Sequence, residues 1–398
     1  MSIERFTLNR RAALAGMAAL PVMGCADAAM VPAASAPGAG TAPGVSGPSL
    51  DALAMRGNRR FGSAVASTPG RTDAGSIQNP RYADIVKAEC GIVVPENEMK
   101  WQATRPGPDS YDFARMDQIA AWASANDLAL RGHTLLWHRP QWFPDWLNTY
   151  DFGANPVREG ERLVAEHIRA VTRRYRGQIT SYDVVNEAID HDRNMPIETS
   201  LSRAMGSPEA VLDLAFHTAR EELPQGQLVY NDYMSWEPAH AKHCADVLRL
   251  LEGFRKRGVP VDALGIQSHI EMFEIDPATG VGPYDERGWR MFLDEVTGMG
   301  YRLLITEFDV KDTALPAGIA ARDEKVADFS RRYLDLMLEY DAHLDDILAW
   351  GMVDGFNWLQ YFDPAKREDG LEVRGTPYDS QYRAKPLRTA IAQAFIDA

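Results

Sequence analysis

Short apolar runs alternate with helix-like stretches along most of the chain, and this alternation constrains the fold more than any other feature. Several runs are almost continuously apolar, as strands buried on both faces are. The eight predicted strands cover residues 61–65, 91–95, 129–137, 180–186, 227–231, 263–269, 302–307 and 347–351. Eight strand-then-helix units predict a closed parallel (β/α)8 barrel, the TIM barrel of the α/β class.

Helical periodicity between the predicted strands supports this order. Val164, Ile168, Val171 and Tyr175 recur at helical spacing, and Gly177 is expected to end that helix. An open doubly wound sheet is the alternative, but it would usually carry a glycine-rich phosphate-binding turn after the first strand, and the sequence has none there. We therefore expect one barrel domain over residues 55–398.

The first 54 residues differ in composition from the rest. Arg10 and Arg11 precede a short apolar run over residues 12–22, which is typical of an export signal over residues 1–28 and is similar to a twin-arginine signal. The sequence VMGC at residues 22–25 resembles a bacterial lipobox, in which Cys25 would be lipidated. The alternative is ordinary cleavage at the ADA sequence of residues 26–28. Residues 29–54, rich in Ala, Gly, Pro and Ser, predict a flexible linker.

These N-terminal features predict an exported protein. It would be periplasmic, tethered to the outer membrane through a lipid on Cys25, or extracellular.

Charge and cysteine content narrow the class of partner. The chain of 398 residues has a net charge of −14, and an acidic surface repels nucleic acid and anionic membranes, so no nucleic-acid partner is expected. The three cysteines, Cys25, Cys90 and Cys244, lack the close spacing of metal ligands. Cys90 and Cys244 are predicted to be buried core residues without a disulfide between them.

Polar and aromatic side chains gather where the predicted strands end, and in such barrels that end carries the active site. A single residue of this kind is usually solvated, salt-bridged or part of the core. Seven strands that end this way would leave unsatisfied polar atoms around one mouth unless it is a site. The residues are Glu96, Asn97, Lys100, Trp101, His133, Trp137, His138, Asn186, Glu187, Asn231, Asp232, Tyr233, Gln267, His269, Glu307, Asp309, Trp350 and Trp358.

The content of this mouth indicates the chemistry. Two carboxylates on different strands, Glu187 and Glu307, suit acid/base and nucleophilic work on an acetal, and the tryptophans offer flat apolar faces for sugar rings. Histidines and acids could instead bind a metal, but the sequence has no chelating spacing such as HxH or HExxH. We therefore expect no metal and no cofactor.

The motifs at these strand ends, in this order, resemble those of family 10 glycoside hydrolases, which are mostly endo-β-1,4-xylanases. They are FGSAV (61–65), PENEMKW (95–101), GHTLLWH (132–138), DVVNEA (183–188), NDY (231–233), GIQSH (265–269), ITEFDV (305–310) and WG followed by a second tryptophan (350–358). The resemblance covers about residues 55–395. It implies endo-hydrolysis of internal β-1,4-xylosidic bonds in xylan by a retaining double displacement.

The resemblance also implies residue roles. Glu187 would be the acid/base and Glu307 the nucleophile, supported by His269 and Asp309. The implied substrate-binding residues are Glu96, Asn97 and Lys100 beside the neighbouring sugar, His133, Trp137, Asn186 and Gln267 around the reacting sugar, Trp350 and Trp358 as cleft walls, and Asn231, Tyr233 and His269.

The chain departs from the family pattern at two places. Many members read WHSQ where this chain has WHRP at residues 137–140, so a sugar-contacting glutamine is missing, and many read NDYN where this chain has Met234 in the last place. These departures concern the finer sugar contacts and not the reaction. His191 and Asp192 follow the acid/base and would either contact the leaving sugar or lie in solvent.

Two alternative functions remain at this point. A β-1,4-glucanase or cellulase of the same clan would share the barrel and both glutamates. A non-catalytic xylan-binding lipoprotein could keep Trp350 and Trp358 but lose a carboxylate, and the presence of both Glu187 and Glu307 argues against it. The expected partners are xylan and xylo-oligosaccharides, and the expected state is a monomer.

Overall fold

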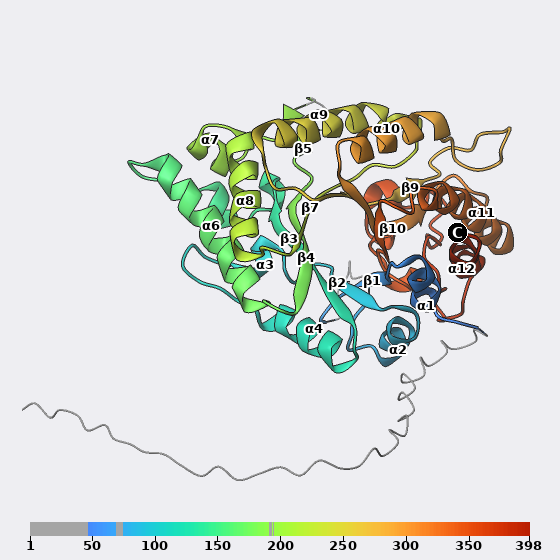
Figure 1. Ribbon diagram of the computed structural model, residues 1–398. Coiled ribbons are helices and arrows are strands. Elements are labelled where there is room, and N and C mark those ends of the chain that lie inside the picture. The colour runs from blue at the N-terminus through green and yellow to red at the C-terminus, as the bar shows by residue number, and fades with distance from the viewer. Residues whose placement is uncertain (1–46, 69–74, 191–192, 194) are drawn as a thin grey trace, which may run out of the picture. The chain divides into compact units, whose positions relative to one another are not determined.

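The barrel predicted from the alternating pattern is confirmed. The computed structural model describes residues 47–68, 75–190, 193 and 195–398. In these residues, eight parallel strands pair in a ring, and the pairing of β11 with both β1 and β10 closes it (Figure 1). The strands are β1 (Phe61–Val65), β2 (Ile92–Pro95), β3 (Ala129–Trp137), β4 (Ile179–Asn186), β7 (Gln227–Asp232), β8 (Ala263–Ile266), β10 (Arg302–Lys311) and β11 (Leu344–Ala349).

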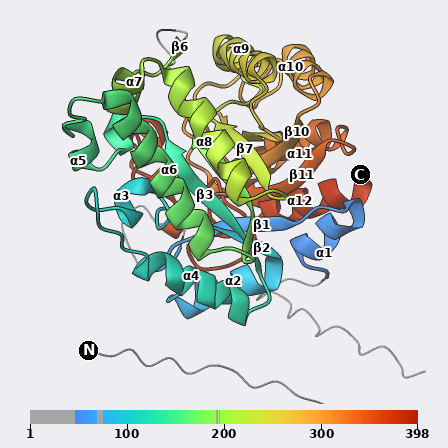
Figure 2. The same cartoon turned by 60° about the vertical axis from the view of Figure 1, so that its left-hand side comes forward.

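Helices surround the barrel and connect each strand to the next (Figures 1 and 2). The long helices are α2 (Pro80–Glu89), α4 (Ala114–Ala125), α6 (Pro156–Arg174), α8 (Pro208–Glu222), α9 (Ala241–Arg257), α10 (Glu286–Gly298), α11 (Ile319–Leu338) and α12 (Pro386–Asp397). The shorter ones are α1 (Leu50–Ala54), α3 (Trp101–Thr104), α5 (Asp145–Asn148) and α7 (Ser200–Met205). Single 3-10 turns form at Met55–Gly57, Pro140–Trp142, Pro238–His240, Asp354–Phe356, Trp358–Gln360 and Asp363–Ala365.

Helix α6 forms where the sequence predicts it. Val164, Ile168 and Val171 lie on one face and are fully buried, and Tyr175 caps the carboxyl end of the helix. Gly177 follows with φ 80°, a left-handed conformation that glycine adopts at no steric cost. The apolar stripe therefore packs onto the barrel, and the glycine turns the chain into β4.

Two strands differ most from the prediction at their carboxyl ends. The sixth predicted strand breaks after Ile266, because Ser268 adopts φ 61°, and the chain resumes as β9 (His269–Glu271). β10 continues beyond Glu307 to Lys311, because its last three residues pair with β9. A short hairpin of β5 (Ile189–Asp190) and β6 (Met195–Pro196) after β4 is a further element that the sequence pattern did not indicate.

Residues 48–54 belong to the folded domain, so the linker predicted over 29–54 ends too late. Leu50 and Leu53 of α1 are buried, and the Leu50 N–H donates to Glu89 Oε2 at 2.8 Å. Arg388 of α12 donates to the Pro48 carbonyl at 2.8 Å. The short apolar segment LDALA packs as a helix, which the composition of the region around it concealed. The predicted signal, Cys25 and the earlier part of the linker lie outside the described residues.

Cys90 and Cys244 are buried and unpaired, as predicted, and burial raises the pKa of both thiols. Among the described residues, no helix has the length and apolar content needed to cross a membrane. In the same part of the chain, no three or more His, Cys, Asp or Glu side chains are grouped so that they could hold a metal ion.

Candidate active site

The predicted site residues lie in the carboxyl-terminal part of a barrel strand or in the segment that follows it. Glu96, Asn97 and Lys100 follow β2, His133 and Trp137 belong to β3, and Asn186 ends β4 before Glu187. Asn231 lies in β7 with Tyr233 after it, and Gln267 and His269 lie at the break between β8 and β9. Glu307 and Asp309 belong to β10, and Trp350 and Trp358 follow β11. The barrel therefore brings side chains that are far apart in sequence to one mouth.

Glu187 is held in an unusual backbone conformation. Its φ is 49°, in the left-handed region that residues other than glycine rarely adopt, and its N–H donates to the Asn231 carbonyl at 2.9 Å. Trp137 Nε1 donates to Glu187 Oε2 at 3.1 Å, and Gln267 Nε2 donates to Oε1 at 2.9 Å. Trp137 of β3 and Gln267 after β8 therefore fix the position of this carboxyl group, and Asn231 of β7 fixes the backbone that carries it.

The environment of Glu187 favours its protonated form. Burial raises the pKa of this carboxyl, and the negative charges of Asp232 and Glu307 raise it further. The guanidinium of Arg139 and the hydrogen bond from Gln267 act in the opposite direction, but the pKa stays above its ordinary value. Glu187 is thus suited to give a proton.

Glu307 lies in an environment of the opposite kind. Burial would raise its pKa, but the hydrogen bond from His269 and the nearby charges of His133 and His269 hold the pKa below its usual value. Asn231 Nδ2 donates to Glu307 Oε1 at 2.8 Å, and His269 Nε2 lies 3.3 Å from Oε2. Glu307 is thus an ionised, hydrogen-bonded carboxylate.

A chain of hydrogen bonds fixes the histidine behind Glu307. His269 Nδ1 lies 2.8 Å from Asp309 Oδ1, and Trp358 Nε1 donates to Asp309 Oδ2 at 2.6 Å. Burial alone would lower the pKa of His269, but the adjacent Asp309 and Glu307 carboxylates raise it to about 9. His269 is therefore positively charged at neutral pH, with one N–H directed at each of the two carboxylates.

Two asparagines and a glutamine link the two glutamates into one network. Asn186 Oδ1 accepts from Asn231 Nδ2 at 2.8 Å and lies 3.4 Å from Gln267 Nε2. Asn231 contacts Glu307, and Gln267 contacts Glu187. A shift of either carboxyl group would disturb the bonds of the other, so the pair is positioned as a unit.

His133 depends on a buried aspartate that the sequence reasoning missed. His133 Nδ1 lies 2.9 Å from Asp183 Oδ2, and Asp183 also accepts two hydrogen bonds from Arg131. The His133 ring packs edge-on against Trp350, with ring centroids 5.3 Å apart. An acidic residue within the apolar run of β4 was the signal that could have identified Asp183 as a site residue.

Polar groups and aromatic faces meet on the β2 and β3 side of the mouth. Lys100 Nζ donates to Asn97 Oδ1 at 2.9 Å and lies 4.6 Å from the ring centroid of Trp137. Glu96 is buried beside them, and Trp142 stacks on Trp137 with ring centroids 4.4 Å apart. This combination of donors, acceptors and flat apolar surface suits a carbohydrate.

Of the two departures from the family pattern, one contacts the candidate acid/base and the other lies in the hydrophobic core. Arg139, in the WHRP segment, lies with Nε 3.2 Å from Glu187 Oε2, so it is part of the site although its role was not predicted. Its place directly after the residues that end β3 was the available signal. Met234 is buried in the hydrophobic core. His191 and Asp192 lie outside the described residues.

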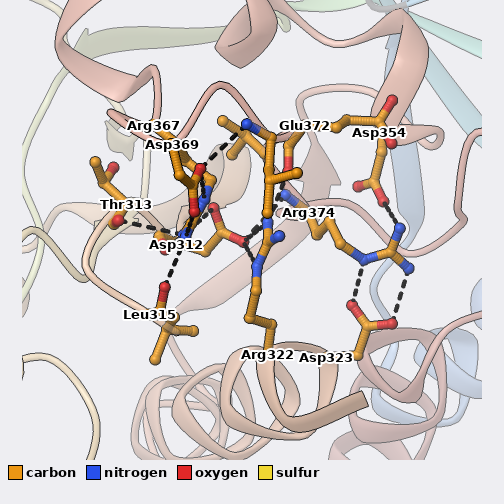
Figure 3. Close-up of polar contacts among 12 residues, drawn as sticks. Asp312, Thr313, Leu315, Arg322, Asp323, Asp354, Arg367, Asp369, Glu372 and Arg374 are labelled. Carbon is orange, nitrogen blue, oxygen red and sulfur yellow. Dashed lines mark hydrogen bonds and ion pairs between the residues drawn. The ribbon is translucent and has the colours of Figure 1, made fainter. Parts of the chain in front are cut away.

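Buried ion pairs hold the segment between β11 and α12, which carries Trp350 and Trp358. Figure 3 shows this network. Arg374 donates two hydrogen bonds of 2.8 Å to Asp323 of α11, and Arg322 Nε donates to Asp312 Oδ2 at 3.0 Å. Arg367 donates to the backbone carbonyls of Thr313 and Leu315 and to Asp369. Buried pairs of this kind fix geometry more than they add stability, so they keep the tryptophan-bearing segment in place.

Comparisons with known proteins agree with this site. The family model for glycosyl hydrolase family 10 matches residues 49–394. Endo-1,4-beta-xylanase B of Thermotoga neapolitana is 28% identical over 313 residues, which cover 79% of this chain and 83% of that protein. The crystal structure of native xylanase 10B from Thermotoga maritima superposes with a TM-score of 0.73 at 26% identity, covering 88% of this chain and 98% of that one. Xylanase 10B from Thermotoga petrophila, solved in complex with xylobiose, gives a TM-score of 0.74 at 25% identity, covering 89% and 98%. The chain belongs to glycosyl hydrolase family 10.

Proposed function

We propose that this chain is an endo-β-1,4-xylanase that cleaves internal bonds of xylan by a retaining double displacement. The observation that carries the proposal is the pair of carboxyl groups whose pKa values are shifted in opposite directions, Glu187 upward and Glu307 downward, within one hydrogen-bond network. Such a pair identifies an acid and a nucleophile. The names of the similar proteins, xylanases in each case, support xylan as the substrate.

In the first step Glu307 attacks the anomeric carbon of the sugar. A bond forms between a Glu307 carboxylate oxygen and C1, the bond from C1 to the leaving oxygen breaks, and Glu187 gives its proton to that oxygen. His269 and Asn231 keep Glu307 ionised and oriented for this attack. The product of this step is a covalent glycosyl-enzyme.

In the second step water releases the sugar. Formation of the glycosyl-enzyme removes the negative charge of Glu307, so the pKa of Glu187 falls and its carboxylate can accept a proton from water. The water oxygen bonds to C1, the Glu307 ester bond breaks, and Glu187 is protonated again. Two inversions at C1 give net retention.

The two alternative functions are weaker. A β-1,4-glucanase of the same clan would share both glutamates, but the named relatives favour xylan. A non-catalytic xylan-binding protein would have no need for an ionised Glu307 backed by His269 and Asp309.

A reducing-sugar assay on beechwood xylan and carboxymethylcellulose tests the proposal. The wild-type protein should release sugar from xylan much faster than from carboxymethylcellulose, and Glu307→Ala should release none. Glu198→Ala is the matched control, because Glu198 is an exposed carboxylate paired only loosely with Arg203 at 3.7 Å. Equal rates on both polymers would favour the glucanase, and an inactive wild-type protein would favour the binding protein.

We further propose that the protein is exported, that it is a monomer, and that a lipid on Cys25 tethers it to a membrane. The basic pair Arg10 and Arg11, the apolar run after it and the VMGC sequence support this proposal. One acyl chain anchors only marginally, so stable attachment needs a second. Mass spectrometry of the mature N-terminus should find a diacylated Cys25. An unmodified N-terminus beyond Cys25 would exclude the anchor, and a retained Met1 would exclude processed export. Light scattering tests the monomer.

A further inference from the structure

Arg139 contacts both the side chain and the backbone of Glu187, the residue proposed as acid/base. Its Nε lies 3.2 Å from Glu187 Oε2 and donates to the Glu187 backbone carbonyl, also at 3.2 Å. Its Nη2 donates to the Ile189 carbonyl at 3.1 Å. The two side chains are only 19% and 15% exposed, so water screens their interaction weakly. The guanidinium therefore contacts both the carboxylate and the backbone that carries it.

The guanidinium is itself fixed from a second strand. Its Nη2 lies 3.3 Å from the Tyr233 hydroxyl oxygen, and its central carbon lies 5.4 Å from the centroid of the Tyr233 ring. The Tyr233 ring stacks on His243, with ring centroids 4.3 Å apart. Arg139 is thus held between the ends of β4 and β7 and is not a mobile surface cation.

Both positive and negative groups lie near Glu187. In the described part of the chain, the charged and titratable groups are Arg139 after β3, Lys100 before α3, Asp232 and Tyr233 at the end of β7, and Glu307 on β10. Gln267 after β8 is neutral, and His133 and His269 act on Glu307. Asp232 and Glu307 disfavour the ionised form of Glu187. The charge of Lys100 favours that form, but its ammonium group makes its contacts with Asn97 and Trp137. Among the residues that the structure describes, Arg139 is the cation that contacts the carboxylate.

We propose, resting on the function proposed above, that Arg139 is a positioning residue that holds Glu187, favours its ionised form and so sets the alkaline limit of hydrolysis in this protein. The residue belongs to the WHRP segment at residues 137–140, directly after the end of β3.

The effect of Arg139 on the two steps is opposite in sign. Glu187 must be protonated for bond cleavage, and a fixed cation beside it lowers the pH at which that proton is lost. In the second step Glu187 must be ionised, and the same cation favours this state. The alkaline limb of the pH profile of kcat/KM reports the acid group of the free enzyme, so this limb is the readout that Arg139 controls.

The test is the pH profile of kcat/KM for xylohexaose with the full-length protein and four variants. Arg139→Gln removes the charge but keeps an amide that can donate to the backbone carbonyls, and Arg139→Met removes both. The alkaline limb should move up by about 1 to 3 pH units in both, since an adjacent opposite charge shifts a carboxyl pKa by that amount. Loss of the His269 proton near pH 9 limits how far the limb can move.

Two control variants separate the effect of the charge at position 139 from the effect of the shape of the side chain and from the effect of the protein's net charge. Arg139→Lys keeps the charge, so its alkaline limb should stay near that of wild type even if the maximum falls. Arg173→Met makes the same net-charge change as Arg139→Met in the last turn of α6, where Arg173 is 61% exposed and pairs with Glu222. It should leave the profile unchanged. The acid limb should not move in any variant, because Glu307 keeps His269 and Asn231.

Each outcome decides between the roles. A lower maximum with an unmoved alkaline limb in Arg139→Gln and Arg139→Met would make Arg139 a purely structural residue and overturn the inference. A shift of the limb in Arg173→Met equal to that in Arg139→Met would overturn it too. A wild-type protein that hydrolyses no xylo-oligosaccharide at any pH would overturn the proposed function itself, whereas an active wild type with an unmoved limb refutes only the role of Arg139.

Discussion

The Asp309→Asn substitution should remove most of the charge from the histidine behind the nucleophile. Asp309 accepts from His269 Nδ1 at 2.8 Å and from Trp358 Nε1 at 2.6 Å. His269 and Asp309 are buried, and Trp358 is partly buried. Asparagine keeps the size of the side chain but loses its negative charge. Burial lowers the pKa of His269, and without the Asp309 charge only Glu307 raises it, so His269 should become neutral at neutral pH.

The magnitude follows from the pKa of His269. It rises from 6.5 to about 9 on folding, a rise of about 2.5. At about 1.4 kcal/mol for each pKa unit, this corresponds to about 3 kcal/mol of stability at most. Because the folded-state pKa is raised, this stability is fully present below pH 6.5 and is lost as the pH rises through about 9. The substitution should therefore cost about 2 to 3 kcal/mol at about pH 6 and much less at about pH 10.

Urea unfolding of the wild type and of Asp309→Asn over this pH range measures the difference directly. Groups outside the network of His269, Asp309 and Glu307 titrate equally in both proteins, so they cancel in the comparison. The activity profile gives a second check, since a neutral His269 no longer lowers the pKa of Glu307 and the acid limb of kcat/KM should move to higher pH. A difference in unfolding free energy that is the same at both ends of the range would refute the charged His269.

Two further predictions concern catalysis and specificity. Glu187→Ala should slow xylan hydrolysis by at least about 100-fold, and azide should restore part of the activity. The variant should cleave activated aryl xylobiosides with a far smaller loss in the bond-cleavage step, because a good leaving group needs little protonation. Equal losses on both substrates would contradict the acid role. The site should also reject the C6 hydroxymethyl group of glucose, so kcat/KM on cello-oligosaccharides should be about 10- to 200-fold below that on matched xylo-oligosaccharides. Equal values on the two kinds of substrate would contradict this exclusion.

The barrel could be predicted from the sequence because its strands are buried on both faces. Several strands then appear as short, nearly continuous apolar runs, and the mouth of the barrel appears as the polar residues that end the strands. The break between Ile266 and His269 could not be predicted, since it depends on the positive φ of Ser268 and on pairing between β9 and β10. These are contacts between segments far apart in the chain.

The electrostatic partners of the site were harder to predict than its members. Glu187 and Glu307 stand in recognisable motifs, but the contact of Arg139 with Glu187 spans 48 residues and requires the chain to turn after β3. The pair of Arg374 and Asp323 likewise joins residues 51 apart. Charged residues at such positions look like ordinary surface groups in the sequence, and only the fold shows that they are buried against each other.

The stereochemistry of the first product tests the central claim most directly. If Glu307 forms a glycosyl-enzyme that water then opens, proton NMR of xylohexaose during hydrolysis should show the new reducing ends first as the β-anomer, with the α-anomer growing later by mutarotation. First appearance of the α-anomer would mean that water attacks C1 directly, and it would contradict the roles assigned to both Glu187 and Glu307.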